Sequence, residues 1–489
     1  MDLLALLDQR EKNHVHIIRR VLMNGGRMTV SELESVMDLS YNTLTSYLDE
    51  IQKIARRLGA GVQINVIDST IEIDLDNQVP ISELVDHYYQ EALNVKLLHL
   101  LAFSNQMTKQ LLSQTLQISQ SSVQRRIQHI NNHIREFNIE IVANRFVGSE
   151  LQIRYFLYNL FSKVETMKDE KVSQKTYELA LNLQKDIIGY NDLTLLHPIV
   201  TWIAIAQQRT TLVLNSRHSF EPSILNNIKK DSVYRAIKKN YNTYFSDVEM
   251  FDSELEYLYT YLFVVSMGIL DRKDKYAIKI INGDFPLLPI IENINQKTLL
   301  QLKKDFPIIN DDLMIYEDVV YLLSQMHLQM FIFEGFGVYF DNQTIEKKAV
   351  DYMDLYVDTL ATRLLHTCAD VIEKELSNAA WQLAYYRYQS IVHDLVRRQN
   401  KPIIIGLDFR LNNILYRTMT QRLMRFLNVN VIMKRVQPHQ TYDLVITNYQ
   451  NVHRTYDSPY IYRIAEFETE YDRRKIMTII KEIYLARLK

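Results

Sequence analysis

Apolar residues recur at helical spacing near the start of the chain and predict a helix-turn-helix. The expected helices are 13–23, 30–37 and 41–58. Thr29 is followed three residues later by Glu32, which fits a capping box at the start of the second helix. Asp38–Ser40 then forms a short turn before the longer third helix. Alternating apolar positions over 62–66 and 71–75 predict a β-hairpin wing after it.

The same pattern returns in the next segment of the chain. Helices are expected over 95–103, 108–116 and 120–137, with Gln117–Ser119 as the turn before the last of them. Strands over 139–142 and 146–153 are expected to pair across Asn144-Arg145 as a second wing. Repetition makes the pattern more specific than either copy alone, and it predicts tandem winged helix-turn-helix units over 1–78 and 79–156.

The rest of the chain is first helical and then alternates between strands and helices. Helical stripes continue to about residue 399 and include 199–209, 255–269, 316–333 and 352–371. They predict two helical bundles, over 157–285 and 286–398. Strands at 402–406, 429–433, 443–447 and 460–465 then alternate with helices at 413–427 and 472–488. The predicted fold is therefore a mainly α multidomain protein that ends in a small α/β domain with a parallel sheet, over 399–489.

Composition supports this architecture, and charge adds a functional hint. Only 11 Gly and 9 Pro occur in 489 residues, which favours helices. The net charge is only −2, but basic and acidic residues are unevenly distributed along the chain. The segment 96–135 holds five Lys or Arg and no Asp or Glu. The segment 401–489 holds fifteen basic and eight acidic residues. A basic island in an otherwise acidic chain is typical of nucleic-acid contact, although a solvated basic helix face has the same composition.

Several classes of site find no support in the sequence. The single cysteine, Cys368, lies in the apparent helical run Ala361–Leu376 and excludes both a disulfide framework and a Cys-based zinc cluster. No metalloprotease helix, phosphate-binding glycine loop or dinucleotide fingerprint occurs, so we expect no catalytic residue, no metal, no cofactor and no enzyme activity. The longest uncharged apolar stretch, Tyr257–Leu270, is too short to span a bilayer, and we expect a soluble cytoplasmic protein.

The long helix of the second unit carries the strongest candidate DNA-binding surface. Val123, Ile127, Ile130 and Ile134 define its buried face, which leaves a polar face of Gln, Ser and Arg without a carboxylate. Gln and Arg can read adenine and guanine edges, and Ser can reach phosphate. In the first unit, Asp49 and Glu50 follow the equivalent positions, so we expect it to contribute less affinity. The candidate DNA-contacting residues are Gln120, Ser121, Ser122, Gln124, Arg125, Arg126 and Gln128 in the second unit, with Ser40, Tyr41, Asn42, Thr43 and Ser46 in the first.

The order of these parts resembles the Mga/AtxA family of global virulence regulators from Gram-positive bacteria. The segment Leu195–Arg209 is similar to the helix that carries the regulatory His of the first phosphotransferase-system regulation domain. The segment Val147–Phe156 is similar to the family's passage from second wing to first regulation domain. The resemblance implies a double-stranded-DNA-binding transcriptional activator with two phosphorylatable regulation domains. It also implies a C-terminal domain similar to an enzyme II B component, through which two chains form a homodimer.

The resemblance also implies phosphorylation by the phosphotransferase-system phosphocarrier protein. His197 is the first candidate, and Pro198 after it predicts a helix N-terminus where a phosphate on the imidazole would be stabilised. From the residues alone an inert His is the alternative. His327 is the second candidate, because Arg387 stands where some relatives carry a second phosphorylatable His. No Cys follows the 402–406 strand, so phosphoryl-transfer chemistry is not expected in the last domain.

Two other classes of function share parts of this pattern. An RNA-binding antiterminator with the same regulation domains is disfavoured by the helix-turn-helix units, because the major groove of A-form RNA is too narrow for a helix. A phosphocarrier enzyme is disfavoured by Gly406–Arg410, which lacks the cysteine that such a domain holds after its first strand.

Overall fold

The described part of the chain divides into two compact units. The computed structural model describes residues 3–57, 62–75, 81–104, 107–162, 164, 172–190, 192–210, 222–245, 253–270, 289–335, 352–372, 378–399, 402–427, 431–449, 456–464 and 469–488. One unit comprises Met1–Lys297, Glu317–Glu346 and Cys368–Ala384, and the other comprises Thr298–Tyr316, Lys347–Thr367 and Tyr385–Lys489. Residues of the predicted second bundle, 286–398, therefore fall in both units, and the bounds of the five predicted domains remain predictions.

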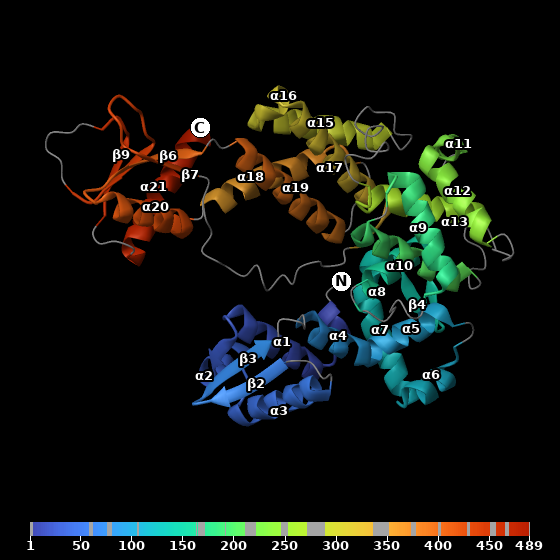
Figure 1. Ribbon diagram of the computed structural model, residues 1–489. Helices are drawn as coiled ribbons and strands as arrows, with labels where there is room; N and C mark the ends of the chain where they lie inside the picture. The colour runs from blue at the N-terminus through green and yellow to red at the C-terminus, as the bar shows by residue number, and fades with distance from the viewer. Residues whose placement is uncertain are drawn as a thin grey trace. The chain divides into compact units, whose positions relative to one another are not determined.

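Two winged helix-turn-helix units open the first compact unit, as the sequence predicted (Figure 1). The first consists of α1 (Gln9–Met23), α2 (Val30–Met37) and α3 (Tyr41–Arg57) with strands β1 (Arg27–Thr29), β2 (Val62–Ile67) and β3 (Thr70–Leu75) in the order β1-β3-β2. The second consists of α5 (Leu93–Phe103), α6 (Lys109–Leu116), α7 (Gln120–Ile134), the 3-10 helix η2 (Arg135–Phe137) and strands β4 (Glu140–Val142) and β5 (Arg145–Val147). All strand pairs in these units are antiparallel.

The two helix-turn-helix turns are built in the same way. Each begins with a residue in the left-handed region, Asp38 (φ 51°) and Gln117 (φ 54°), which ends the second helix of its unit. An apolar residue follows, and then a serine whose hydroxyl accepts a backbone N–H of the third helix, Ser40 from Thr43 at 3.4 Å and Ser119 from Ser122 at 3.2 Å. The predicted capping box of α2 is also present, because Thr29 and Glu32 bond reciprocally.

The structure corrects the sequence prediction at the second wing. The strand expected over 146–153 ends at Val147, and the hairpin turns at Ala143-Asn144 rather than at Asn144-Arg145. Helix α8 (Glu150–Phe161) occupies the remainder, and all of its side chains are buried. A helix buried on all sides shows no 3.6-residue stripe, which is why the local alternation was misleading.

Three further elements of the first compact unit were not anticipated. Strand β1 adds a third strand to the first sheet, and helix α4 (Ile81–Glu91) connects the two winged units. A 3-10 helix, η1 (Leu3–Leu6), precedes α1, which itself begins four residues earlier than expected.

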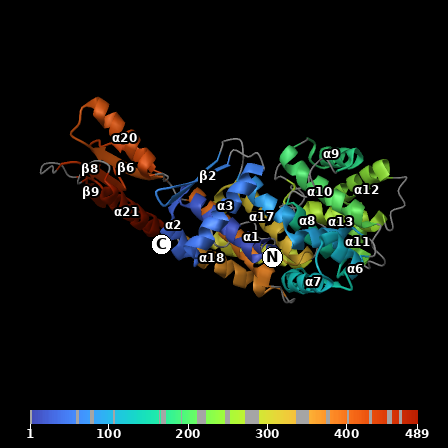
Figure 2. The ribbon, with the colours of Figure 1, turned by 90° about the horizontal axis from the view of Figure 1, so that it is seen from below.

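Helix α8 leads from the second wing into a helical bundle. The bundle contains α9 (Gln174–Ile188), α10 (Leu193–Thr210), α11 (Pro222–Lys230), α12 (Ser232–Phe245) and α13 (Ser253–Ser266), which form one group of helices with α8 in both ribbon views (Figures 1 and 2). The ring of Trp202 on α10 stacks on Phe263 of α13, with centroids 4.3 Å apart. Later in the chain come α15 (Pro289–Asp305), α16 (Ile308–Asp311), α17 (Leu313–Ile332), α18 (Tyr352–Ala369) and α19 (Asn378–Gln399). The helical run expected over Ala361–Leu376 thus ends at Ala369, with buried Cys368 in its last turn.

The chain ends in the predicted α/β domain. Strands β6 (Ile403–Asp408), β7 (Val431–Arg435), β8 (Leu444–Thr447) and β9 (Tyr460–Arg463) form a parallel sheet in the order β7-β6-β8-β9. Helices α20 (Asn413–Leu427) and α21 (Glu470–Leu488) contribute to one core with Ile405, Leu407 and Leu444. These side chains alternate along the strands, so both helices cover the same face of the sheet. Nowhere in the described ranges does a helix meet the length and apolarity needed to cross a membrane.

Candidate nucleic-acid interface

Helix α7 presents the polar face that the sequence predicted. Its buried side is fixed by Val123, Ile130 and Ile134, each fully buried, with Ile127 partly buried beside them. The opposite side is exposed to solvent, and Ser122 lies at its edge and is half-buried. The exposed members of the predicted set are Gln120, Ser121, Gln124, Arg125 and Gln128. This is the surface that a recognition helix offers to the major groove.

The electrostatics of this face suit a polyanion. Residues 96–135 contain no carboxylate side chain, so nothing in the segment would repel phosphates. Lys109, at the start of α6, donates from Nζ to Oε1 of Gln124 at 2.7 Å. That bond occupies the carbonyl end of the Gln124 amide and leaves its NH₂ group to donate to acceptors such as base edges or phosphate oxygens.

Arg126 differs from the prediction that it contacts DNA beside Arg125. Its guanidinium makes two bonds to the carboxylate of Asp8, at 3.0 and 2.9 Å, and a third to Oδ1 of Asn94 at 3.0 Å. Only 18% of its side chain is exposed. The helical step between neighbouring residues turns Arg126 toward the protein and Arg125 toward solvent, so we remove Arg126 from the proposed DNA-binding face.

Side chains of α7 also hold the second wing in place. Asn131 accepts from Ile141 N–H at 2.7 Å and donates to its carbonyl at 2.9 Å, as a neighbouring strand would. At the hairpin tip, Asn144 donates to the carbonyl of Met107 at 3.1 Å. The neighbouring Arg145 is exposed. The wing is therefore fixed relative to the recognition helix, as DNA-binding winged units require.

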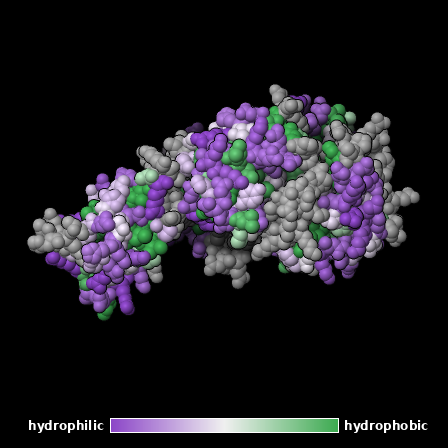
Figure 3. All heavy atoms as spheres, turned by 90° about the horizontal axis from the view of Figure 1, so that it is seen from above, coloured by the Kyte–Doolittle hydropathy of each residue, from purple (hydrophilic) through white to green (hydrophobic). Residues whose placement is uncertain are grey.

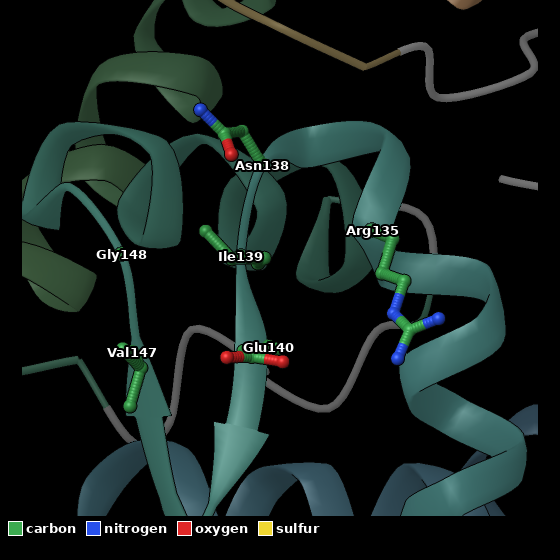
Figure 4. Close-up of a pocket in the computed structure, with 6 residues that line it drawn as sticks. All are labelled: Arg135, Asn138, Ile139, Glu140, Val147 and Gly148. Atoms are coloured by element: carbon green, nitrogen blue, oxygen red, sulfur yellow. The ribbon is translucent and has the colours of Figure 1, made fainter.

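Sequence reasoning missed a shallow hollow of about 290 Å³ beside this wing (Figure 4). Arg135 from η2 and Glu140 from β4 contribute opposite charges to its lining. The mixture does not favour an anion, and the hollow forms only when the β4–β5 hairpin folds back beside η2, which no local sequence pattern shows. The lining residues are Arg135, Asn138, Ile139, Glu140, Val147 and Gly148.

The first unit places its predicted residues at the start of α3. Ser40 is the N-cap, Tyr41 is 58% exposed, Asn42 and Ser46 are exposed, and Thr43 is half-buried. Glu50 lies on the same helix, but Arg10 of α1 forms a two-point ion pair with it. Burial alone would raise the pKa of Glu50, yet the hydrogen bond and charge of Arg10 outweigh it and hold that pKa below its ordinary value. Arg10 thus compensates the negative charge of Glu50 near the exposed start of α3, whereas Asp49 remains exposed.

The two candidate histidines lie in contrasting surroundings. His197 is exposed, but α10 begins at Leu193, where Asp192 accepts from the Thr194 N–H at 2.8 Å. The prediction that His197 sits at a helix N-terminus is therefore wrong, and Pro198 lies inside the helix. His327 on α17 is 1% exposed, and its Nδ1 bonds Oδ1 of Asn295 at 2.5 Å. Burial lowers the pKa of His327 to about 3, and its side chain is not exposed at the surface of this structure.

The end of β6 in the α/β domain holds an acidic residue. Asp408 accepts from the hydroxyls of Tyr449 at 3.0 Å and Tyr456 at 2.7 Å. Burial, together with the hydrogen bond to Asp408, raises the pKa of Tyr456 to about 12. In the part of the chain that the structure describes, no three His, Cys, Asp or Glu side chains gather where they could hold a metal ion.

Three-helix units with a wing and a basic recognition face define the winged helix-turn-helix class of DNA-binding domains. Residues 77–161 match the family model of the Mga helix-turn-helix domain. The match covers the second unit and confirms the resemblance to the Mga/AtxA regulators. That family consists of transcription regulators rather than enzymes. Among curated proteins, none matches this chain.

Proposed function

We propose that this protein is a transcription regulator that binds duplex DNA through both N-terminal units, with the greater share of affinity from the second. The supporting observation is that the segment matching the Mga helix-turn-helix domain exposes a recognition face without a carboxylate. Recognition helices with Gln and Arg at such positions read base edges, while basic and hydroxyl side chains hold phosphates. The resemblance adds activation as the expected sense of control.

Arg125 provides the first test of this proposal. Arg125→Ala should weaken binding to a target duplex about tenfold or more and reduce the dependence of affinity on salt, because fewer counterions are released. Lys175→Ala is the matched control, since it removes one exposed charge on α9, outside the winged units. Titration of a labelled duplex at several salt concentrations measures both quantities. An equal effect of the two substitutions would show that α7 is not the DNA-binding surface.

Comparing the affinities for duplex DNA and hairpin RNA distinguishes a DNA-binding regulator from an RNA-binding antiterminator. A regulator of DNA should bind duplex DNA more tightly than hairpin RNA of equal charge, because an α-helix enters only the wider major groove of B-DNA. Tighter binding to the hairpin would favour an antiterminator. Transfer of a phosphoryl group from this chain to an acceptor would favour a phosphocarrier instead.

We also propose that two chains associate through the C-terminal α/β domain. Both described helices of the domain cover one face of the sheet, whereas parallel sheets are almost always covered on both. On the other face, Val445 at the centre is fully buried, but the edge strands expose apolar side chains: Ile432 on β7 is 42% exposed and Ile461 on β9 is 55% exposed. Figure 3 shows hydrophobic atoms among the hydrophilic surface of this domain. A second copy is the occupant that would bury such a face symmetrically.

Substitution on that face tests the association. Ile461→Lys should shift the full-length chain from dimer to monomer in light scattering, because a charge would be buried at an apolar contact. Ile414→Lys is the control, since Ile414 is 78% exposed on α20, the helix that covers the other face. Truncation after Gln399 should likewise yield a monomer. A truncated chain that remains dimeric would place the interface in the bundles.

Phosphorylation of His197 is the proposed means of control. The side chain is exposed, and a phosphoryl group would add about −1.5 to −2 charges at its surface position. His197→Ala removes the acceptor, whereas His197→Asp places a permanent, weaker charge there. We expect the two variants to differ in promoter output while both bind DNA. Equal output, or no phosphohistidine after incubation with the general phosphocarrier protein, would make His197 an ordinary surface residue.

A further inference from the structure

The first residues that the structure describes, from Leu3 onward, pack against the second winged unit. We call Leu3–Asp8 the N-terminal strap. Leu4, Leu6 and Leu7 are at most 5% exposed. The carbonyl of Ala5 lies 2.8 Å from Nε2 of His129 on α7, and the carbonyl of Leu6 accepts from Asn94 on α5 at 2.8 Å.

Arg126 closes the strap onto α7. Its two bonds to Asp8 form a fork-to-fork ion pair, and its bond to Asn94 draws α5 into the same cluster. Asp8 is also the N-cap of α1, and its backbone N–H donates to Glu11 at 2.8 Å. Arg126 therefore connects α7, the recognition helix of the second unit, to the N-terminus of α1, the first helix of the first unit.

A second connection runs through α4. His14 on α1 lies 3.2 Å from the hydroxyl of Tyr88 on α4, and both side chains are buried. Only Ala92, itself fully buried, separates α4 from α5. Because α1 also packs against α3, contacts run without interruption from one recognition helix to the other.

We propose that the N-terminal strap locks the two winged units in one fixed relative arrangement. The recognition helices α3 and α7 of one chain would then contact DNA at one fixed spacing. The inference rests on the proposed DNA-binding function. Units on a flexible linker would accept many spacings and would lose conformational freedom on binding. A locked pair has already lost that freedom, and it selects targets by the distance between two contacted segments as well as by their sequence.

Arg126 is then a positioning residue, whereas Arg125 is a contact residue. The two are adjacent and equally charged, but Arg125 is exposed and Arg126 is bonded to the strap. Their substitution should have opposite consequences. Arg125→Met should lower DNA affinity at every spacing, and Arg126→Met should relax the spacing itself.

The lock can be measured without DNA. Spin labels at Lys53→Cys on α3 and Asn132→Cys on α7 occupy exposed positions outside the proposed contact set, while Cys368 is fully buried and stays unlabelled. The full-length chain should give one narrow distance distribution. Arg126→Met and Asp8→Asn should broaden it, and Arg125→Met should leave it unchanged. Asparagine keeps the N-cap of α1, so Asp8→Asn retains the fold. Equal widths in all four proteins would overturn the proposal.

Selection from a pool of random duplexes gives the DNA readout. The unmodified chain should enrich two sequence segments at one separation, and Arg126→Met should enrich the same segments at several separations. A single separation in both proteins, or several in both, would refute the lock. Failure of the unmodified chain to enrich any duplex would contradict the proposed function instead, and the distance measurement would still decide on the strap.

Discussion

Replacing Arg154 with Met should destabilise the first compact unit by about 3–5 kcal/mol, since it leaves the buried carboxylate of Glu256 without its charged partner. Arg154 is 1% exposed and donates to both oxygens of Glu256 at 2.6 and 2.7 Å, and to Glu150 at 2.9 Å. Methionine fills similar space but offers no donor. The expected result is a marked fall in the midpoint of the first thermal or denaturant-induced unfolding transition. That transition is followed separately, because a chain of several units does not unfold in two states.

A matched control uses an exposed ion pair in the same bundle. Lys239 bonds Asp186 at 3.0 Å, but 71% of the lysine side chain is exposed, so Lys239→Met should cost less than about 1 kcal/mol. Arg154→Lys should fall between the two variants, because an ammonium cannot reproduce the forked contacts. Similar midpoints for Arg154→Met and Lys239→Met would contradict this account of the buried network.

The same network predicts the response to acid. Burial alone would raise the pKa of Glu150, but the charges and hydrogen bonds of Arg209 and Arg154 outweigh it and hold that pKa below the ordinary 4.5. A folded-state pKa below the unfolded value adds stability that is present above about pH 4.5. That stability is lost as the pH falls toward the lower folded value.

Arg209 extends this network from the bundle into the second winged unit. It bonds both oxygens of Glu150, at 2.7 and 2.8 Å, and donates to the carbonyl of Ala102 near the end of α5 at 2.7 Å. Arg209 lies on α10, the same helix as His197. A change in the position of α10 would therefore reach the helices that support α7, which gives the proposed phosphorylation a physical route to the DNA-binding face.

Much of the fold could be predicted because its elements carry local signals. Helix α7 has a serine N-cap and an apolar stripe, and the strand Ile403–Asp408 is a short apolar run flanked by polar residues. The internal repeat strengthened both winged units. The polar face of α7 followed directly from the positions that its buried side excluded.

Other features depend on contacts that no local pattern encodes. Arg125 and Arg126 are equivalent by composition, and Arg126 is distinguished by its bonds to Asn94 and to Asp8, the latter 118 residues earlier. Likewise, His197 followed by Pro198 suggested a helix start, but an N-cap at Asp192 placed the start five residues earlier. Pro198 is instead the sixth residue of α10, past the first turn in which proline is best tolerated, so a proline does not always mark the first residue of a helix.

Gly335→Ala should also cause a large loss of stability, for two separable reasons. Gly335 has φ 86°, where any side chain is strained by about 1–2 kcal/mol. A Cβ there would lie 2.4 Å from Cδ1 of Phe137, which is 1% exposed and cannot move aside freely. Overpacking of this kind adds about 1–3 kcal/mol. Gly189, which also has φ 86° but has no atom within 4 Å of its Cβ position, isolates the backbone strain alone.

The contact of Gly335 links the end of α17 to the end of the recognition helix. Phe333 stacks on Tyr155 of α8 with centroids 4.2 Å apart, and the carbonyl of Ile332 accepts from Gln152 at 3.0 Å. Phe137 lies in η2, directly after α7. Displacing its ring should therefore disturb the DNA-binding face as well as the core.

We expect Gly335→Ala to lower both the unfolding midpoint and the affinity for duplex DNA, and Gly189→Ala to lower only the midpoint, by a smaller amount. Adding Phe137→Leu should recover part of the Gly335→Ala loss, because the smaller side chain vacates the space of the ring. A double-mutant cycle on unfolding midpoints measures that coupling. Equal losses for the two glycine variants, or no coupling with Phe137, would show that the end of α17 does not bear on the recognition helix.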